Sequence, residues 1–127
     1  NRAKEILARP RTIPRPDTLE EIYAQRTLGM ADYPATIPVP LQAFRIGDMS
    51  FGSMPNEVFV ETGLEFKQRT PFKPGVLVSI AHGYYGYLPT PEHHKLGGYE
   101  TWLGTNRFEP EASTKMLGAL IEMLGKL

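Results

Sequence analysis

Hydrophobic and polar positions alternate with a period of two in the middle of the chain, as they do in a half-buried β-strand. Residues 41–46 and 49–54 carry this pattern, and they flank Gly47-Asp48, a dipeptide that accepts the backbone of a tight turn. The pattern predicts two antiparallel strands joined as a hairpin. Pro55-Asn56 is expected to end the second strand.

After the hairpin, the period changes to that of a helix and then back to that of a strand. Residues 57–69 have helical spacing, and residues 76–81 form a nearly unbroken apolar run of the kind found in strands buried on both faces. Strand, helix and strand in this order predict a βαβ unit with parallel strands and a right-handed crossover. Both strands then end at one edge of the sheet, so residues 55–57 and 82–87 are expected to be neighbours in a ligand-binding crevice.

Helical patterns flank this unit on both sides. Thr18 and Glu21 have the spacing of a capping box, which predicts a helix from there to about Leu28. The side of this helix that is expected to dock on a neighbour carries Leu19, Ile22, Tyr23 and Arg26. Near the end of the chain, Pro110 suits the first position of another helix. The apolar stripe by which this second helix is expected to dock on the sheet consists of Met116, Leu117, Leu120, Ile121, Leu124 and Leu127.

Together these elements predict a mixed α/β (α+β) fold, in which a β-hairpin leads into a βαβ unit with a C-terminal docking helix. Six of the twelve prolines lie before residue 41, so residues 1–40 are expected to form a Pro-rich, extended and partly helical segment that wraps over a surface. The whole is expected to be part of a larger domain.

Composition and charge narrow the function classes. The chain has 127 residues, with 14 Lys and Arg against 14 Asp and Glu, and this balance argues against a nucleic acid partner. No Cys is present, which excludes disulfides, thiolate metal sites and a Cys nucleophile. No apolar run is long enough for a transmembrane segment. The sequence also lacks a Gly-x-Ser-x-Gly elbow, a P-loop and a Gly-x-Gly-x-x-Gly motif.

Chemically active side chains gather between residues 82 and 102. This window holds His82, His93 and His94, four of the six tyrosines and the only tryptophan. We interpret it either as a loop pinned by aromatic packing or as the wall of a ligand site. Because His93 and His94 are adjacent and point apart, we expect both to be exposed rather than bound to a metal.

Glu57 is expected in the first turn of the predicted helix, just beyond the end of a strand. There the helix dipole and the free N–H groups favour a charged carboxylate, which suits it to bind a cation. The alternative is that Glu57 only caps the helix. A carboxylate, phenols and imidazoles around one crevice would suit Zn²⁺ or a similar divalent ion. A metal site and a non-catalytic ligand-binding or structural domain that uses the Tyr/His-rich loop both stay open at this point.

Three stretches of the chain, residues 46–57, 81–92 and 98–100, resemble the later part of the catalytic domain of the neutral/alkaline ceramidase family. The resemblance rests on the Met-Pro-Asn-Glu turn, on the Tyr-rich loop with its Leu-Pro-Thr-Pro-Glu ending, and on the Gly-Tyr-Glu triplet. Two positions depart from the family: His82 stands where the family has Asn, and Tyr85-Gly86 stands where it has Ser-Gln. The wall of the pocket is therefore expected to differ.

The resemblance implies that residues 41–127 are the C-terminal portion of a ceramidase-like, zinc-dependent amide hydrolase. It implies that Glu57 and Tyr87 bind Zn²⁺ and that Tyr99 donates a hydrogen bond to the carbonyl oxygen during hydrolysis. The substrate implied is a lipid-like amide of the N-acylsphingosine type, cut to a fatty acid and a sphingoid base. Two further metal ligands, both histidines, are implied to come from an upstream part of the same protein, and a secreted or periplasmic location is implied as well.

Overall fold

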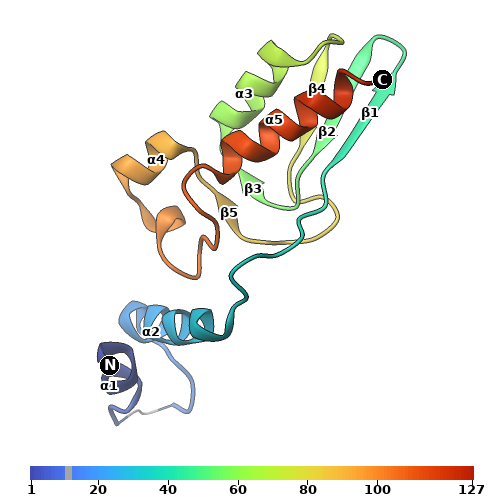
Figure 1. Ribbon diagram of the computed structural model, residues 1–127. Coiled ribbons are helices and arrows are strands. Elements are labelled where there is room, and N and C mark those ends of the chain that lie inside the picture. The colour runs from blue at the N-terminus through green and yellow to red at the C-terminus, as the bar shows by residue number, and fades with distance from the viewer. Residues whose placement is uncertain (11–12) are drawn as a thin grey trace.

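The described part of the chain, residues 1–10 and 13–127 of the computed structural model, contains five α-helices, two 3₁₀ helices and five strands. Arg11 and Thr12, which belong to the expected wrapping segment, lie outside the described residues. The arrangement confirms the predicted mixed α/β fold (Figure 1). In chain order the elements are α1 (Arg2–Leu7), α2 (Leu19–Gly29), η1 (Met30–Asp32), β1 (Gln42–Ile46), β2 (Met49–Ser53), β3 (Glu57–Val58), α3 (Val60–Arg69), β4 (Gly75–Val78), β5 (Tyr87–Leu88), α4 (Pro91–Leu96), η2 (Tyr99–Thr101) and α5 (Ala112–Leu124).

A three-stranded mixed sheet in the order β1-β2-β4 forms the centre of the fold. β1 and β2 are antiparallel, with Ile46 opposite Met49, and Gly47 between them has a φ of 59° that suits the tight turn. β2 and β4 are parallel, with Phe51 opposite Val76. The structure therefore confirms the predicted hairpin and the predicted strand–helix–strand unit.

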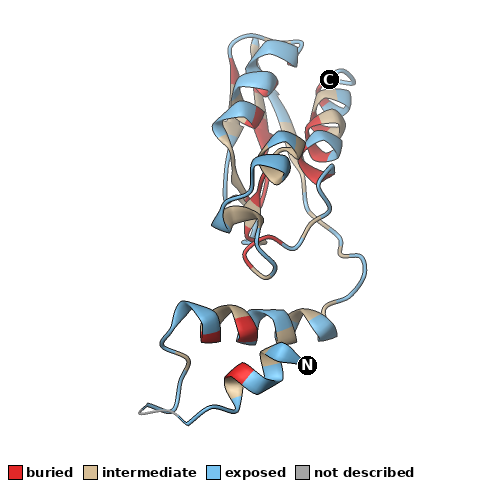
Figure 2. Cartoon of the chain, turned by 90° about the vertical axis from the view of Figure 1, so that its left-hand side faces the viewer, coloured by how far each residue is buried: buried red, intermediate tan, exposed pale blue. Residues whose placement is uncertain are grey.

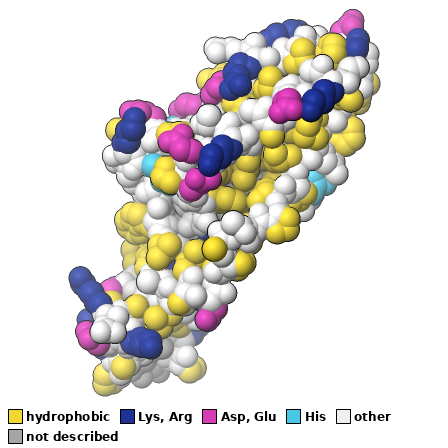
Figure 3. Space-filling view, in the orientation of Figure 1, with side chains coloured by type: hydrophobic (Ala, Val, Ile, Leu, Met, Phe, Trp, Pro, Cys, Tyr) yellow, Lys and Arg dark blue, Asp and Glu magenta, His cyan; other side chains and the backbone are white. Residues whose placement is uncertain are grey.

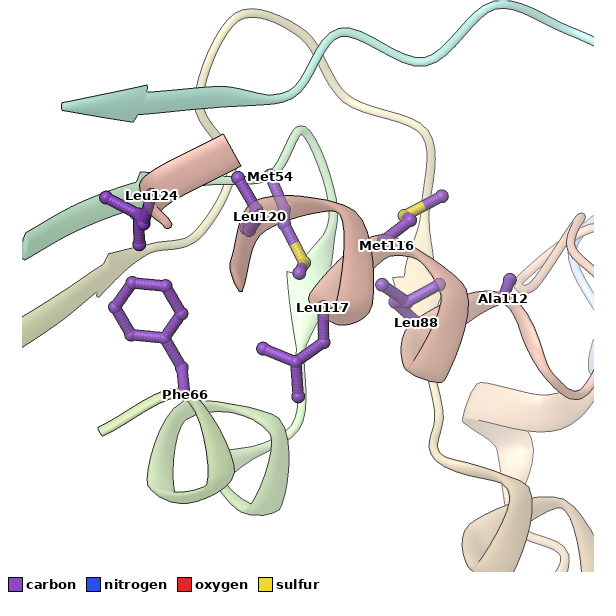
Figure 4. Close-up of a cluster of buried hydrophobic side chains, with 8 residues drawn as sticks. All are labelled: Met54, Phe66, Leu88, Ala112, Met116, Leu117, Leu120 and Leu124. Atoms are coloured by element: carbon purple, nitrogen blue, oxygen red, sulfur yellow. The ribbon is translucent and has the colours of Figure 1, made fainter. Parts of the chain in front are cut away.

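Helices α3 and α5 cover one face of this sheet, and the hydrophobic core lies between the two layers (Figure 2). Phe66 from α3 points toward Leu120 and Leu124 from α5, as Figure 4 shows. Gly52 in β2 permits this close packing, because a Cβ there would lie 2.7 Å from the Phe66 ring. The fully or nearly buried core residues are Met54, Phe66, Leu88, Ala112, Met116, Leu117, Leu120 and Leu124.

The opposite face of the sheet has no helix packed on it among the described elements. Side chains alternate between the faces of a strand, so Phe44, Ile46 and Val78 point away from α3 and α5, and all three are exposed. Val78 is 43% exposed, and β4 lies at the edge of the sheet. The expectation that residues 76–81 are buried on both faces is therefore wrong, because these helices shield only one face.

The predicted docking stripe of α5 is confirmed for most of its length. Leu117, Leu120 and Leu124 are buried against the sheet and α3, whereas Leu127 is exposed beyond the end of the helix. α5 begins two residues after Pro110, at Ala112, so Pro110 lies in the turn before the helix.

Helices α1 and α2 pack against each other at one end of the molecule (Figure 1). Thr18 caps α2 with the predicted capping box, in which its side chain accepts a hydrogen bond from the Glu21 N–H. Tyr23 and Arg26, on the predicted docking side of α2, contact residues 102–105, whereas Leu19 is exposed. Among the described residues, no helix combines the length and the apolar composition needed to cross a membrane.

Candidate functional site

Backbone hydrogen bonds join the segment after β2 to the Tyr-rich segment after β4. The Tyr85 N–H donates to the Pro55 carbonyl at 2.9 Å, and the Glu57 N–H donates to the Gly86 carbonyl at 3.1 Å. Nδ2 of the fully buried Asn56 donates to the same Gly86 carbonyl at 3.2 Å. The prediction that residues 55–57 and 82–87 are neighbours is thereby confirmed.

The two predicted metal ligands lie directly opposite each other in a short parallel ladder. β3 pairs with β5, with Glu57 opposite Tyr87 and Val58 opposite Leu88. Opposite residues of paired strands direct their side chains to the same face of the sheet. The carboxyl group of Glu57 and the phenol of Tyr87 are therefore brought to one surface by the backbone itself.

The sequence placed Glu57 in the wrong element. It was expected in the first turn of a helix, but α3 begins only at Val60, and Glu57 lies in β3. Glu57 therefore lies outside the first turn of α3, whose N-cap is Phe59, and it does not cap the helix. Pairing of β3 with β5 explains the difference, because it draws Glu57 and Val58 into an extended conformation before the helix begins.

Tyr99 completes a cluster of phenols at this edge. Its hydroxyl lies 3.0 Å from that of Tyr87, and the two rings meet edge to face with centroids 5.6 Å apart. Gly97 and Gly98, with φ of 82° and 110°, form the turn that leads into η2 and directs Tyr99 back over β5. The Tyr99 side chain is 48% exposed, so a ligand can reach it.

Tyr84 is a fourth member of the site, and the sequence patterns assigned no role to it. Its hydroxyl donates a hydrogen bond to Oε1 of Glu57 at 2.9 Å. Ser79 stabilises the backbone around β3, since its hydroxyl accepts a hydrogen bond from the Val58 N–H and donates one to the Asn56 carbonyl. The number of tyrosines in this window indicates that a phenol lies near Glu57. Which tyrosine it is depends on the backbone turns at Gly83 and Gly86, both of which have a positive φ.

The negative charge of Glu57 shapes the acidity of its neighbours. Its hydrogen bond from Tyr84 raises the pKa of that phenol above the ordinary value of about 10. The hydrogen bond between the Tyr87 and Tyr99 hydroxyls, and after it the nearby Glu57 carboxylate, raises the pKa of Tyr87 as well. Both phenols are therefore held in their protonated form, and a bound cation would be needed to reverse this preference.

An open pocket of about 360 Å³ lies over these side chains. It is lined by Glu57, Val58, Phe59, Ser79, Tyr87, Tyr99 and Glu100. A carboxylate and phenolic oxygens at one rim can hold a hard or borderline cation, and a phenolic hydroxyl can also donate to a polarised carbonyl oxygen.

The three histidines lie outside this pocket lining. Nε2 of His82 lies 3.1 Å from the Ser53 hydroxyl. His93 and His94 are only partly exposed, which corrects the expectation that both are exposed. Both belong to α4, where the His93 ring packs on Phe59 and Nε2 of His94 contacts Nδ2 of Asn106 at 3.2 Å. Within residues 1–10 and 13–127, no group of three or more His, Asp or Glu side chains is placed to hold a metal ion.

No family model matches this chain, and the searches of curated proteins and of solved structures return no significant match.

Proposed function

We propose that this chain carries part of the active site of a zinc-dependent amide hydrolase that resembles the neutral ceramidases. In this proposal Glu57 and Tyr87 are metal ligands, and Tyr99 donates to the carbonyl oxygen of the substrate. The observation that carries the proposal is the β3–β5 register, which sets Glu57 opposite Tyr87, together with the 3.0 Å contact between the Tyr87 and Tyr99 hydroxyls.

The donor set is compatible with Zn²⁺. One carboxylate and one phenol offer oxygen ligands at an open pocket, and carboxylate oxygen is an ordinary zinc ligand. Two ligands leave room for the two histidines that the resemblance assigns to an upstream part of the same protein. A zinc ion held there would polarise the substrate carbonyl and activate water.

The side chains of this chain have distinct roles in the proposed reaction. Glu57 and Tyr87 bind the zinc ion. The Tyr84 hydroxyl, which donates to Oε1 of Glu57, keeps the Glu57 carboxylate oriented. Tyr99 stands beside Tyr87 and donates its hydrogen to the oxygen on which negative charge develops. The substrate proposed is a lipid-like N-acyl amide, and the secreted or periplasmic location stays a prediction.

The test compares zinc content and ceramide hydrolysis in the intact protein, purified without chelator. Glu57→Gln and Tyr87→Phe are expected to lose both zinc and activity. Tyr99→Phe is expected to retain zinc while kcat falls roughly 100-fold, because only a transition-state hydrogen bond is removed. Tyr85→Phe is the matched control: Tyr85 belongs to the same loop but lies outside the pocket lining, so both properties should persist.

Stoichiometric zinc in Glu57→Gln, or undiminished hydrolysis in Tyr87→Phe, would contradict the proposal. A protein that binds no zinc and cuts no amide in its unmodified form would instead favour the non-catalytic ligand-binding domain.

A further inference from the structure

A second concave surface lies along the edge of β4 that faces away from β2, the outer edge of the sheet. It has a volume of about 810 Å³ and is lined by Lys67, Lys73 and residues 74–77. β4 is the last strand in the order β1-β2-β4, so a neighbouring strand covers only one of its two edges (Figure 1). A strand in this position presents backbone N–H and C=O groups that another extended chain can bind.

The β2–β4 ladder identifies the backbone groups that lie on the outer edge. The carbonyls of Pro74 and Val78 both accept backbone hydrogen bonds from the β2 segment, at 3.1 and 3.0 Å. Successive residues of a strand direct their backbone groups to opposite edges, so those of Gly75 and Leu77 point away from β2. Within the described part of the chain, no backbone hydrogen bond of a turn or loop uses these groups. They are the donors and acceptors that an added strand would pair with.

The two faces of the sheet differ beside this edge. Gly52 faces the helix layer, because a Cβ there would meet the Phe66 ring, and Leu77 lies directly opposite Gly52 on the same face. Val76 and Val78 therefore lie on the other face, where Val78 is exposed. A strand added at the outer edge would place alternate side chains beside these two valines and the remaining ones beside α3.

Two lysines carry uncompensated positive charge on the α3 side of the outer edge. Lys67 lies in the last turn of α3, and Nζ of Lys73 donates hydrogen bonds to backbone carbonyls at the end of that helix. Arg69 in the same turn pairs with Glu65 at 2.6 Å, but no described carboxylate pairs with either lysine. Figure 3 shows Lys and Arg side chains, together with acidic ones, near the end of the molecule where α3 ends. This side of the edge therefore attracts negative charge.

We propose that the outer edge of β4 binds an extended acidic peptide segment of a partner protein as an additional strand. Apolar side chains of the peptide lie beside Val76 and Val78, and its acidic side chains lie beside Lys67 and Lys73. This interaction surface is separate from the pocket at Glu57 and does not depend on the proposed function.

Charge favours such a partner over a second copy of this chain. Two β4 edges paired about a twofold axis would bring the lysines of both copies together, which is repulsive. β1, the other edge of the sheet, contains Arg45 and no acidic residue, so it does not complement the outer edge of β4 either. Neither edge of this sheet supplies the negative charge that the lysines attract.

The first experiment tests the chemistry of the peptide. The probe is an acetylated, fluorescein-labelled hexapeptide of alternating Glu and Val, and it is titrated with the 127-residue chain while fluorescence anisotropy is recorded. A peptide of alternating Lys and Val with the same label should bind at least about tenfold more weakly, because its charges would meet Lys67 and Lys73. Binding of the Glu peptide should weaken as salt is added.

The second experiment tests whether the peptide forms a ladder. One version of the Glu peptide is methylated on the amide nitrogens of its Val residues, and another on those of its Glu residues. These two sets of amides lie on opposite edges of an extended peptide, so one version should lose binding at least about tenfold more than the other. Amide hydrogen exchange locates the contact: exchange at Leu77 should slow when the unmethylated peptide binds, and exchange in β1 should not change.

A charge reversal with a matched control tests the site on the protein. Lys67→Glu is expected to weaken binding of the Glu peptide at least about tenfold, because an attraction becomes a repulsion. Lys95→Glu makes the same change in α4, where Lys95 is exposed and lies outside the groove, so its affinity should equal that of the unmodified chain. Unchanged circular dichroism verifies that each variant folds.

Four results would overturn the proposal. These are equal affinity for the Glu and Lys peptides, equal affinity for the two methylated peptides, unchanged affinity in Lys67→Glu, and peptide binding that leaves exchange at Leu77 unaltered. The edge would instead be an interface between copies if sedimentation showed a dimer in which the Leu77 amide is protected without any peptide.

Discussion

The core under α3 and α5 and the candidate site at the β3–β5 edge are held together by different means. Phe66 and Leu120 in the core are fully buried and interact by packing alone. Tyr84 and Tyr99 at the site are exposed, and their positions depend on hydrogen bonds and on the turns before them. The core is therefore expected to be sensitive to side-chain volume, and the site to charge and to backbone conformation.

The largest expected loss of stability follows the removal of an aromatic ring from the hydrophobic core. Phe66→Ala should lower the free energy of unfolding by about 3–5 kcal/mol, because it leaves a cavity between α3, α5 and the sheet. Urea denaturation measures this change. Leu64→Ala on the same helix is the control, since Leu64 is 52% exposed and should cost about 0.5 kcal/mol. Equal losses in the two variants would show that α3 does not dock as described.

A smaller loss of stability is expected when a glycine that shapes the backbone of the candidate site is replaced. Gly86 has a φ of 87°, and a Cβ there would lie 2.5 Å from the Thr105 carbonyl oxygen. Gly86→Ala should therefore cost roughly 2 kcal/mol or more and shift the residues bonded to the Gly86 carbonyl, Asn56 and Glu57.

Gly47→Ala is the control, because it introduces backbone strain without a steric clash like the one with the Thr105 carbonyl oxygen. Gly47 also has a positive φ, of 59°, but nothing lies within 4 Å of its Cβ position, so a loss of about 1 kcal/mol is expected. Thermal unfolding gives both values, and amide chemical shifts show whether the site moves. If Gly86→Ala left the shifts of Glu57 and Tyr87 unchanged, the ladder between β3 and β5 would not depend on this glycine.

The smallest effect on stability is expected for a substitution of Glu57, which should mainly change the pKa of a neighbouring phenol. In Glu57→Gln the carboxylate no longer accepts the Tyr84 hydrogen or opposes a second negative charge, so the raised pKa of Tyr84 falls back toward about 10. Phenolate then forms at lower pH, which ultraviolet difference spectroscopy detects, with Tyr84→Phe identifying the residue. Superimposable titrations of the two proteins would contradict the hydrogen bond. The free energy of unfolding should change by no more than about 0.5 kcal/mol.

The regular elements were predictable because each depends on local periodicity. The alternation on both sides of Gly47 determined the hairpin, and the Thr18–Glu21 spacing determined the start of α2. The order of strand, helix and strand was enough to place residues 55–57 beside residues 82–87. Topology alone therefore located the candidate site before any side chain was considered.

The features that the sequence did not predict depend on contacts between segments distant in sequence. The β3–β5 ladder has two residues on each strand, too few to leave a periodic signal, and it moves Glu57 out of the expected helix. His93 is partly buried because α4 packs against Phe59, and neither segment encodes this contact by itself. Which tyrosines reach Glu57 is decided by turns at glycine, whose φ values no local pattern specifies.

The hydroxyl hydrogens at the site are distributed unevenly. Tyr84 gives its hydrogen to Glu57, and the hydroxyls of Tyr87 and Tyr99 share one hydrogen bond in which either can be the donor. While the carboxylate is ionised, it holds the hydrogen of Tyr84, and one of the other two hydroxyls uses its hydrogen for the shared bond. Only one of the three hydroxyls then has a hydrogen left to offer outward. Neutralising the carboxylate, by a proton or a cation, releases the hydrogen of Tyr84, so the charge of a single side chain decides how many hydrogen bonds this edge of the protein can donate.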